Sequence, residues 1–75
     1  MVIDKVKKIL SEQFDVDMSE LNENTNIEED LGADSVEVID LLMSLEDEFQ
    51  LEIPDEAIDE IRTIADLVAY IEEHA

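Results

Sequence analysis

The sequence predicts an all-α protein, a small four-helix bundle of three longer helices and one short helix with a long first loop. Apolar residues recur with the period of a helix, and no segment alternates as a strand would. At 75 residues the chain is long enough for one domain, 1–75, with a single core. Cysteine is absent, so the polypeptide offers neither disulfides nor a thiol of its own.

Charge sets limits on the partners. The chain has 23 acidic and 4 basic residues and a formal net charge of −19. Lys5, Lys7 and Lys8 stand near the start, and the only other cation is Arg62. Such a surface repels nucleic acid and anionic membranes and attracts basic proteins. A content of 45% apolar residues in helical periods argues against disorder, which is otherwise common in such acidic chains.

The first helix is predicted over Val2–Phe14, where apolar residues follow one stripe. A long connection over Asp15–Glu29 comes next, rich in Asp, Asn, Ser and Glu. We expect it to pack onto the core through three apolar anchors, Met18, Leu21 and Ile27. The run Thr25–Glu28 could start one short helical turn within it.

The stretch Glu29–Glu37 contains the only glycine of the chain, Gly32. A lone glycine before a helix indicates a turn with positive φ. Asp34 is a good N-cap, and Glu37 three residues later completes the spacing of a capping box. Ser35 is then the first helical residue, where it could help to cap the helix or could carry a phosphate favoured by the helix dipole. These residues alone leave both interpretations open.

The second helix is predicted from Ser35 to about Gln50. Its core-facing stripe comprises Val38, Leu41, Leu42, Leu45 and Phe49. Further apolar residues, Val36, Ile39 and Met43, widen the apolar arc, and acidic residues take the remaining face. This margin is either a docking surface or a set of ordinary exposed apolar side chains, and the pattern does not decide between them.

Two helices complete the prediction. Asp55, after Pro54, is expected to cap a short third helix over Glu56–Ile61. Thr63 is expected to cap a fourth helix from Ile64 to about His74.

Catalysis and specific metal binding find no support. The best register for a calcium loop starts at Asp15 but has Glu20 at the turn glycine and Asn26 at the bidentate glutamate. One histidine, His74, and no cysteine make a zinc site implausible. Nothing assembles a nucleophile, a base and an oxyanion donor, so we expect a protein that is not an enzyme and has no specific metal. Loose association of divalent cations with the acidic surface is expected.

These features resemble the acyl carrier proteins. The resemblance rests on Glu29–Ser35 (EDLGADS), on the helix ending Leu45–Phe49 (LEDEF), on Glu52–Glu56 (EIPDE) and on Thr63–Ile71 (TIADLVAYI). It extends over essentially the whole chain, including Val6–Ile9 (VKKI).

The resemblance implies that Ser35, flanked by Asp34, carries 4′-phosphopantetheine transferred from coenzyme A by a phosphopantetheinyl transferase. The thiol of this arm would hold acyl groups as thioesters. The interior of the bundle would open between helices to shelter the acyl chain. The implied acyl cavity is lined by Leu41, Leu45, Ile58, Ile61 and Leu67. The implied partner-binding face, which meets basic surfaces of fatty-acid synthesis enzymes, comprises Val36, Glu37, Asp40, Met43 and Asp47.

The favoured function is therefore a carrier of acyl intermediates between fatty-acid biosynthesis enzymes. Two alternatives stay open: a carrier for polyketide, peptide or alanyl-transfer chemistry, and an unmodified acidic interaction module. We expect a cytoplasmic protein, since no segment has the pattern of a signal peptide or a membrane span. A monomer is the default expectation.

Overall fold

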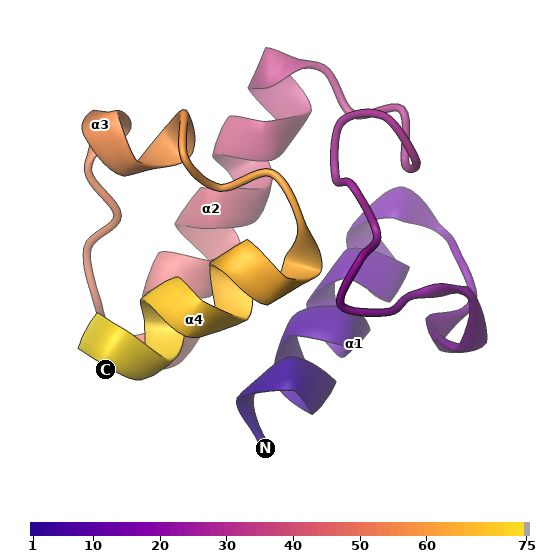
Figure 1. Ribbon diagram of the computed structural model, residues 1–75, viewed down its shortest axis with the longest axis horizontal. Helices are drawn as coiled ribbons and strands as arrows, with labels where there is room; N and C mark the ends of the chain where they lie inside the picture. The colour runs from indigo at the N-terminus through magenta and orange to yellow at the C-terminus, as the bar shows by residue number, and fades with distance from the viewer. Residues whose placement is uncertain (75) are drawn as a thin grey trace.

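The computed structural model describes residues 1–74 and confirms the all-α prediction (Figure 1). Its elements, in order, are α1 (Val2–Phe14), the 3-10 helix η1 (Met18–Glu20), α2 (Ser35–Phe49), α3 (Asp55–Ile58) and α4 (Ile64–His74). None of the described residues belongs to a regular strand. Within the same range, every helix falls short of the length and apolar character that crossing a bilayer requires.

The helices α1 and α2 run antiparallel, as two side-chain contacts at their opposite ends show. Near the start of α1, Lys5 Nζ lies 5.9 Å from the centroid of the Phe49 ring at the end of α2. Near the end of α1, Gln13 Nε2 donates a hydrogen bond of 3.3 Å to the carbonyl of Glu37 in the first turn of α2. Helix α4 packs against α1 to complete the core. The side chains that are fully buried there are Val6, Leu10, Leu41, Leu45, Ile64, Leu67 and Ile71.

The long connection between α1 and α2 is fastened to the segment that enters α4. An isolated antiparallel bridge joins Asn26 to Thr63. Beside it, the amide of Ile27 donates to the carbonyl of Arg62 at 2.9 Å, and the amide of Ile64 donates to the carbonyl of Thr25 at 3.1 Å. These backbone bonds fix the connection against the bundle, as its predicted packing requires.

Of the three anchors predicted in this connection, two are confirmed and one is wrong. Leu21 and Ile27 are 3% and 2% exposed, whereas Met18 is 39% exposed. The turn predicted at Thr25–Glu28 does form, since the amide of Asp30 donates to the carbonyl of Asn26 at 2.9 Å and Asn26 Oδ1 accepts from the amides of Glu28 and Glu29. A further short turn that was not predicted, η1, forms around Met18. The Asp17 carboxylate accepts a hydrogen bond from the amide of Ser19 and starts η1 there, which leaves Met18 on the outside.

The third helix is shorter than predicted and starts differently. Pro54 occupies the N-cap position, and no side chain caps the helix, so the prediction of Asp55 as the cap is wrong. After Ile58 the amide of Glu60 bonds to the carbonyl of Ala57, three residues back. This tighter pattern ends the regular helix before Ile61, although the chain continues to turn.

The fourth helix begins as predicted. Thr63 Oγ1 accepts a hydrogen bond from the amide of Asp66 at 3.2 Å, and the Thr63 carbonyl accepts from the amide of Leu67. The other end of α4 is joined to the segment that follows α2, because the Tyr70 hydroxyl donates to the carbonyl of Glu52 at 3.2 Å. Helix α4 therefore links both long connections of the chain.

Candidate functional site

The tip of α2 projects from the bundle. All four residues from Asp34 to Glu37 are exposed, and the neighbours on either side, Ala33 and Val38, are buried. Asp34 Oδ1 accepts a hydrogen bond of 2.9 Å from the amide of Glu37, and the Glu37 carboxylate receives the Asp34 amide at 3.5 Å. The predicted capping box is thus confirmed, and it makes Ser35 the first residue of the helix.

Gly32 turns the chain into this tip. Its φ of +67° lies in the left-handed region, as predicted. A Cβ built at this position would have no heavy atom within 4 Å, so space is not the constraint. This conformation favours glycine, and it joins the half-buried Leu31 to the buried Ala33 just before α2.

The start of α2 can accept an anion next to the Ser35 hydroxyl. The amides of Ser35 and Val36 precede the first hydrogen bonds of the helix, and neither donates to any acceptor within residues 1–74. Over the same residues the Ser35 hydroxyl makes no hydrogen bond and stays exposed. Free amides and the positive end of the helix dipole favour a phosphate group at this point.

An exposed face of α2 follows directly from Ser35. Val36, Ile39 and Met43 are 66%, 47% and 60% exposed, which confirms the apolar margin as a surface feature. The carboxylates of Asp40 and Asp47 are exposed at positions of the same face. Along this helix the spacing of Val36, Asp40, Met43 and Asp47 forms one stripe, which is opposite to the buried stripe. Glu37 lies at the edge of this face and also belongs to the capping box.

The residues implied as lining an acyl cavity lie in or beside the core between α2 and α4. Leu41, Leu45 and Leu67 have no exposed area, and Ile61 is 7% exposed. Ile58 is half-buried and, together with Ile61, lines a surface hollow of about 370 Å³ next to Arg62. Leu41, Leu45, Ile61 and Leu67 thus belong to the hydrophobic core, and Ile58 packs against it.

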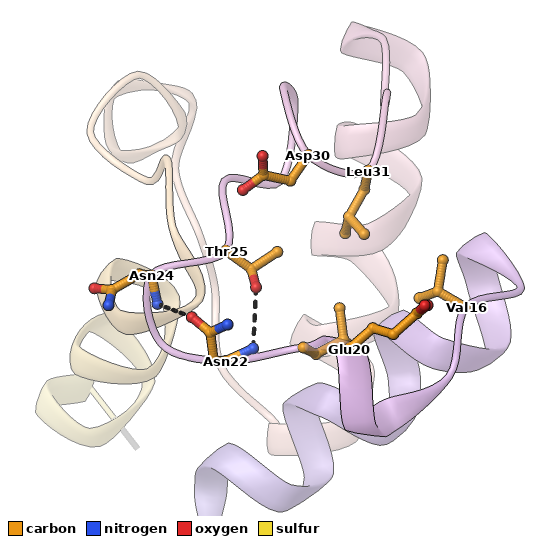
Figure 2. A pocket seen from close by; sticks show the side chains of 8 residues that line it. Val16, Glu20, Asn22, Asn24, Thr25, Asp30 and Leu31 are labelled. Carbon is orange, nitrogen blue, oxygen red and sulfur yellow. Dashed lines mark hydrogen bonds between the residues drawn. The ribbon is translucent and has the colours of Figure 1, made fainter.

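A larger hollow of about 520 Å³ lies in the connection between α1 and α2 (Figure 2). Its polar side chains serve the fold of the loop. Thr25 Oγ1 accepts a hydrogen bond from the amide of Asn22, and Asn22 Oδ1 accepts one from the amide of Asn24. The hollow holds no group that the chemistry at Ser35 requires.

The described residues contain no group of three or more histidine and acidic side chains arranged to hold a metal ion. His74 is occupied elsewhere. Its ring stacks on Tyr70 with centroids 4.0 Å apart, and its Nδ1 lies 2.9 Å from the Tyr70 carbonyl oxygen. The end of α4 and the start of α2 lie at opposite ends of the molecule in Figure 1, so His74 is not placed to act on Ser35.

Comparison with known proteins assigns the family. Residues 4–71 match the family described as the phosphopantetheine attachment site. The chain is 41% identical over 73 residues to an acyl carrier protein of Lactobacillus acidophilus, covering 97% of this chain and 91% of that one. The chain belongs to the acyl carrier protein family. An acyl carrier protein of Clostridium acetobutylicum is 40% identical over 74 residues, covering 99% of this chain and 96% of its own.

Solved structures agree with this assignment to the acyl carrier proteins. The chain superposes with a TM-score of 0.86 on the acyl carrier protein from Enterococcus faecalis, at 40% identity, over 99% of this chain and 94% of that one. Acyl carrier proteins are carriers and not catalysts, as expected for this chain. Their attachment domain bears a covalently bound 4′-phosphopantetheine, and acyl chains and synthesis enzymes are the partners of the family.

Proposed function

We propose that Ser35 carries the 4′-phosphopantetheine and that the protein shuttles acyl intermediates between enzymes of fatty-acid biosynthesis. The observation that carries this proposal is the exposed, unbonded hydroxyl of Ser35 beside the free amides of Ser35 and Val36. In the attachment, Ser35 Oγ forms a bond to the pantetheine-linked phosphorus of coenzyme A. The pyrophosphate P–O bond breaks, the nucleotide leaves, and the transferase removes the hydroxyl proton.

The residues of the tip suit the product of this reaction. The phosphodiester keeps a negative charge beside amides that need an acceptor, which stabilises the charge. The chain has no cysteine, so the bound arm supplies the thiol on which acyl groups are held as thioesters. The exposed position of Asp34, Ser35 and Val36 leaves the arm free to reach other proteins.

The exposed face of α2 is the proposed surface for partner enzymes. Acidic side chains at Glu37, Asp40 and Asp47 would meet Lys and Arg residues of the partner, while Val36 and Met43 would enter apolar depressions. Rim charges accelerate encounters more than they prolong complexes. A carrier that visits a phosphopantetheinyl transferase and then several synthesis enzymes requires short-lived complexes of this kind.

The acyl chain is proposed to enter the core among Leu41, Leu45, Ile58, Ile61 and Leu67. Since three of these side chains are fully buried, the chain must separate elements to enter. The boundary with α3 is the place where separation costs least, because α3 is a single turn in which only Ala57 is buried. We place this activity in the cytoplasm and in a monomer of one domain, residues 1–75.

The test of the attachment is intact-mass analysis of the protein after incubation with coenzyme A and a phosphopantetheinyl transferase. The wild-type chain should gain one phosphopantetheine group, and Ser35→Ala should gain none. Ser44→Ala is the matched control, because Ser44 is another exposed serine of α2 and its loss should leave the modification intact. If the wild-type chain were not modified, both carrier functions would be excluded, and an unmodified acidic interaction module would be the remaining alternative.

A second test addresses the pathway. The modified protein should accept malonyl groups from a fatty-acid synthesis transferase and serve the condensing and reducing enzymes in successive cycles. Loading by polyketide, peptide or alanyl-transfer enzymes alone would assign the carrier to a specialised pathway instead.

A further inference from the structure

The first turn of α2 receives one hydrogen bond from a side chain outside the helix. Gln13 Nε2 of α1 donates to the carbonyl oxygen of Glu37 at 3.3 Å. Among residues 1–74, the remaining side-chain hydrogen bonds of this turn run between Asp34 and Glu37 themselves. Gln13 is thus the polar link between the body of the bundle and the exposed tip that presents Ser35.

The hydrogen bond from Gln13 is made to Glu37, a residue of the capping box that begins α2. Glu37 is the capping-box partner of Asp34, and these two residues set the backbone on both sides of Ser35. A donor that holds the Glu37 peptide therefore restrains the orientation of the whole turn relative to α1. Four consecutive exposed residues, Asp34 to Glu37, give this turn little packing of its own, so a single restraint matters more here than in the core.

We infer that Gln13 is a positioning residue for the attachment of the cofactor. It holds the first turn of α2 in the orientation in which a phosphopantetheinyl transferase reaches the Ser35 hydroxyl. This inference rests on the proposed function of Ser35. The role belongs to the side-chain amide as a donor, so a side chain of similar size without a donor does not replace it.

The residues around Gln13 include positions at which control substitutions can be made. Ile9, Glu12 and Gln13 of α1 line a hollow of about 390 Å³ together with Ser44 and Glu48 of α2. Ser44 Oγ also donates to a carbonyl of α2, that of Asp40, but it does so within the helix. Ser44→Ala thus removes another side-chain donor to a backbone carbonyl of α2 without breaking a link between helices.

The experiment combines transfer kinetics with hydrogen exchange of the free protein. We expect Gln13→Met to raise the KM for the carrier roughly threefold to tenfold with kcat unchanged, since a fraction of molecules would present the tip wrongly. The amides of Glu37 and Val38, which donate to Asp34, should exchange faster by a similar factor. Ser44→Ala should match the wild type in both measurements.

A rescue variant separates the donor from the packing. Gln13→Lys keeps a donor at this position and should restore slow exchange at the tip. Because this change also adds a positive charge, Glu12→Gln, which shifts the net charge equally on the neighbouring residue, is its control in the kinetics.

Two outcomes would overturn the inference. If Gln13→Met raised KM while tip exchange stayed at the wild-type rate, Gln13 would be a direct contact of the transferase. If neither quantity changed, the hydrogen bond would have no role in presenting Ser35. If phosphopantetheine were transferred neither to the wild type nor to any variant, the proposed function itself would be refuted. The role of Gln13 in attachment would then be refuted as well.

Discussion

The residues Asp34 and Glu37 determine where α2 begins. Their reciprocal hydrogen bonds satisfy backbone amides that no helical carbonyl can reach. Because the helix begins there, Ser35 takes the first helical position, where its amide and that of Val36 remain free. Two carboxylates that look like part of a solvated acidic surface thus have a defined structural role.

Two substitutions of Asp34 should distinguish the stabilising effect of its capping hydrogen bond from the effect of its negative charge. We expect Asp34→Ala to lower the free energy of unfolding by about 1 kcal/mol relative to Asp34→Asn, because asparagine caps about as well as aspartate. Both variants remove one negative charge, so electrostatic relief cancels in the comparison. Equal midpoints of urea unfolding for the two variants would show that the capping box does not stabilise α2.

Asp66 plays the corresponding role at the start of α4. Hydrogen bonds from the amides of Arg62 and Thr63 hold the pKa of Asp66 below its ordinary value. Since the pKa is lower in the folded state, the carboxylate stabilises the fold above its unfolded pKa of about 3.9. This stabilisation is lost as the pH falls through the folded pKa.

A comparison with Asp66→Asn should reveal this titration. The difference in unfolding free energy between wild type and variant should be constant near neutral pH and should shift against the wild type below about pH 4. The measurement is denaturant unfolding of both chains over this range. A difference that does not vary with pH would show that Asp66 titrates alike in both states.

At the scale of the elements, the sequence predicted what local rules decide. The helix α1 has the predicted bounds, α2 and α4 start at their predicted caps, and Gly32 has its predicted positive φ. The prediction of Met18 as a buried anchor was wrong because Asp17 starts η1 at that point. The prediction that the third helix extends to Ile61 was wrong because hydrogen bonds to the Ala57 carbonyl tighten the chain after Ile58. The role of Gln13 could not be predicted, because it depends on how α1 and α2 pack.

The packing of the elements also predicts an effect of acyl cargo. A chain that enters between α2 and the segment of α3 and α4 is bound by the folded bundle and released on unfolding, so it should stabilise the fold. We expect the melting temperature to rise from the unacylated to the acylated form. The gain in free energy is at most about 0.8 kcal/mol per buried methylene. Melting temperatures that do not depend on the length of the acyl group would contradict a sheltering core.

At the scale of the whole molecule, charge opposes the fold. The net charge of −19 is spread over a body with extents of 26 × 26 × 19 Å. The Debye length is about 30 Å at 0.01 M salt, so at low salt the carboxylates repel one another across the whole molecule. All three lysines lie on α1, which leaves α2 and α3 without a basic residue to offset this repulsion.

Salt should therefore stabilise the protein. Raising sodium chloride from about 0.01 M to about 1 M shortens the Debye length to about 3 Å, so we expect the melting temperature to rise by several degrees. Magnesium chloride at equal ionic strength serves as the comparison for loosely associated divalent cations. A melting temperature that is the same at all ionic strengths would refute the proposed repulsion.

The most direct test of the account is to locate the added group after reaction with coenzyme A and a transferase. The chain has serines at Ser11, Ser19, Ser35 and Ser44, and fragmentation of its peptides by mass spectrometry distinguishes them. The account predicts phosphopantetheine on the hydroxyl of Ser35 alone. Modification of another serine, with Ser35 left free in the folded protein, would contradict it.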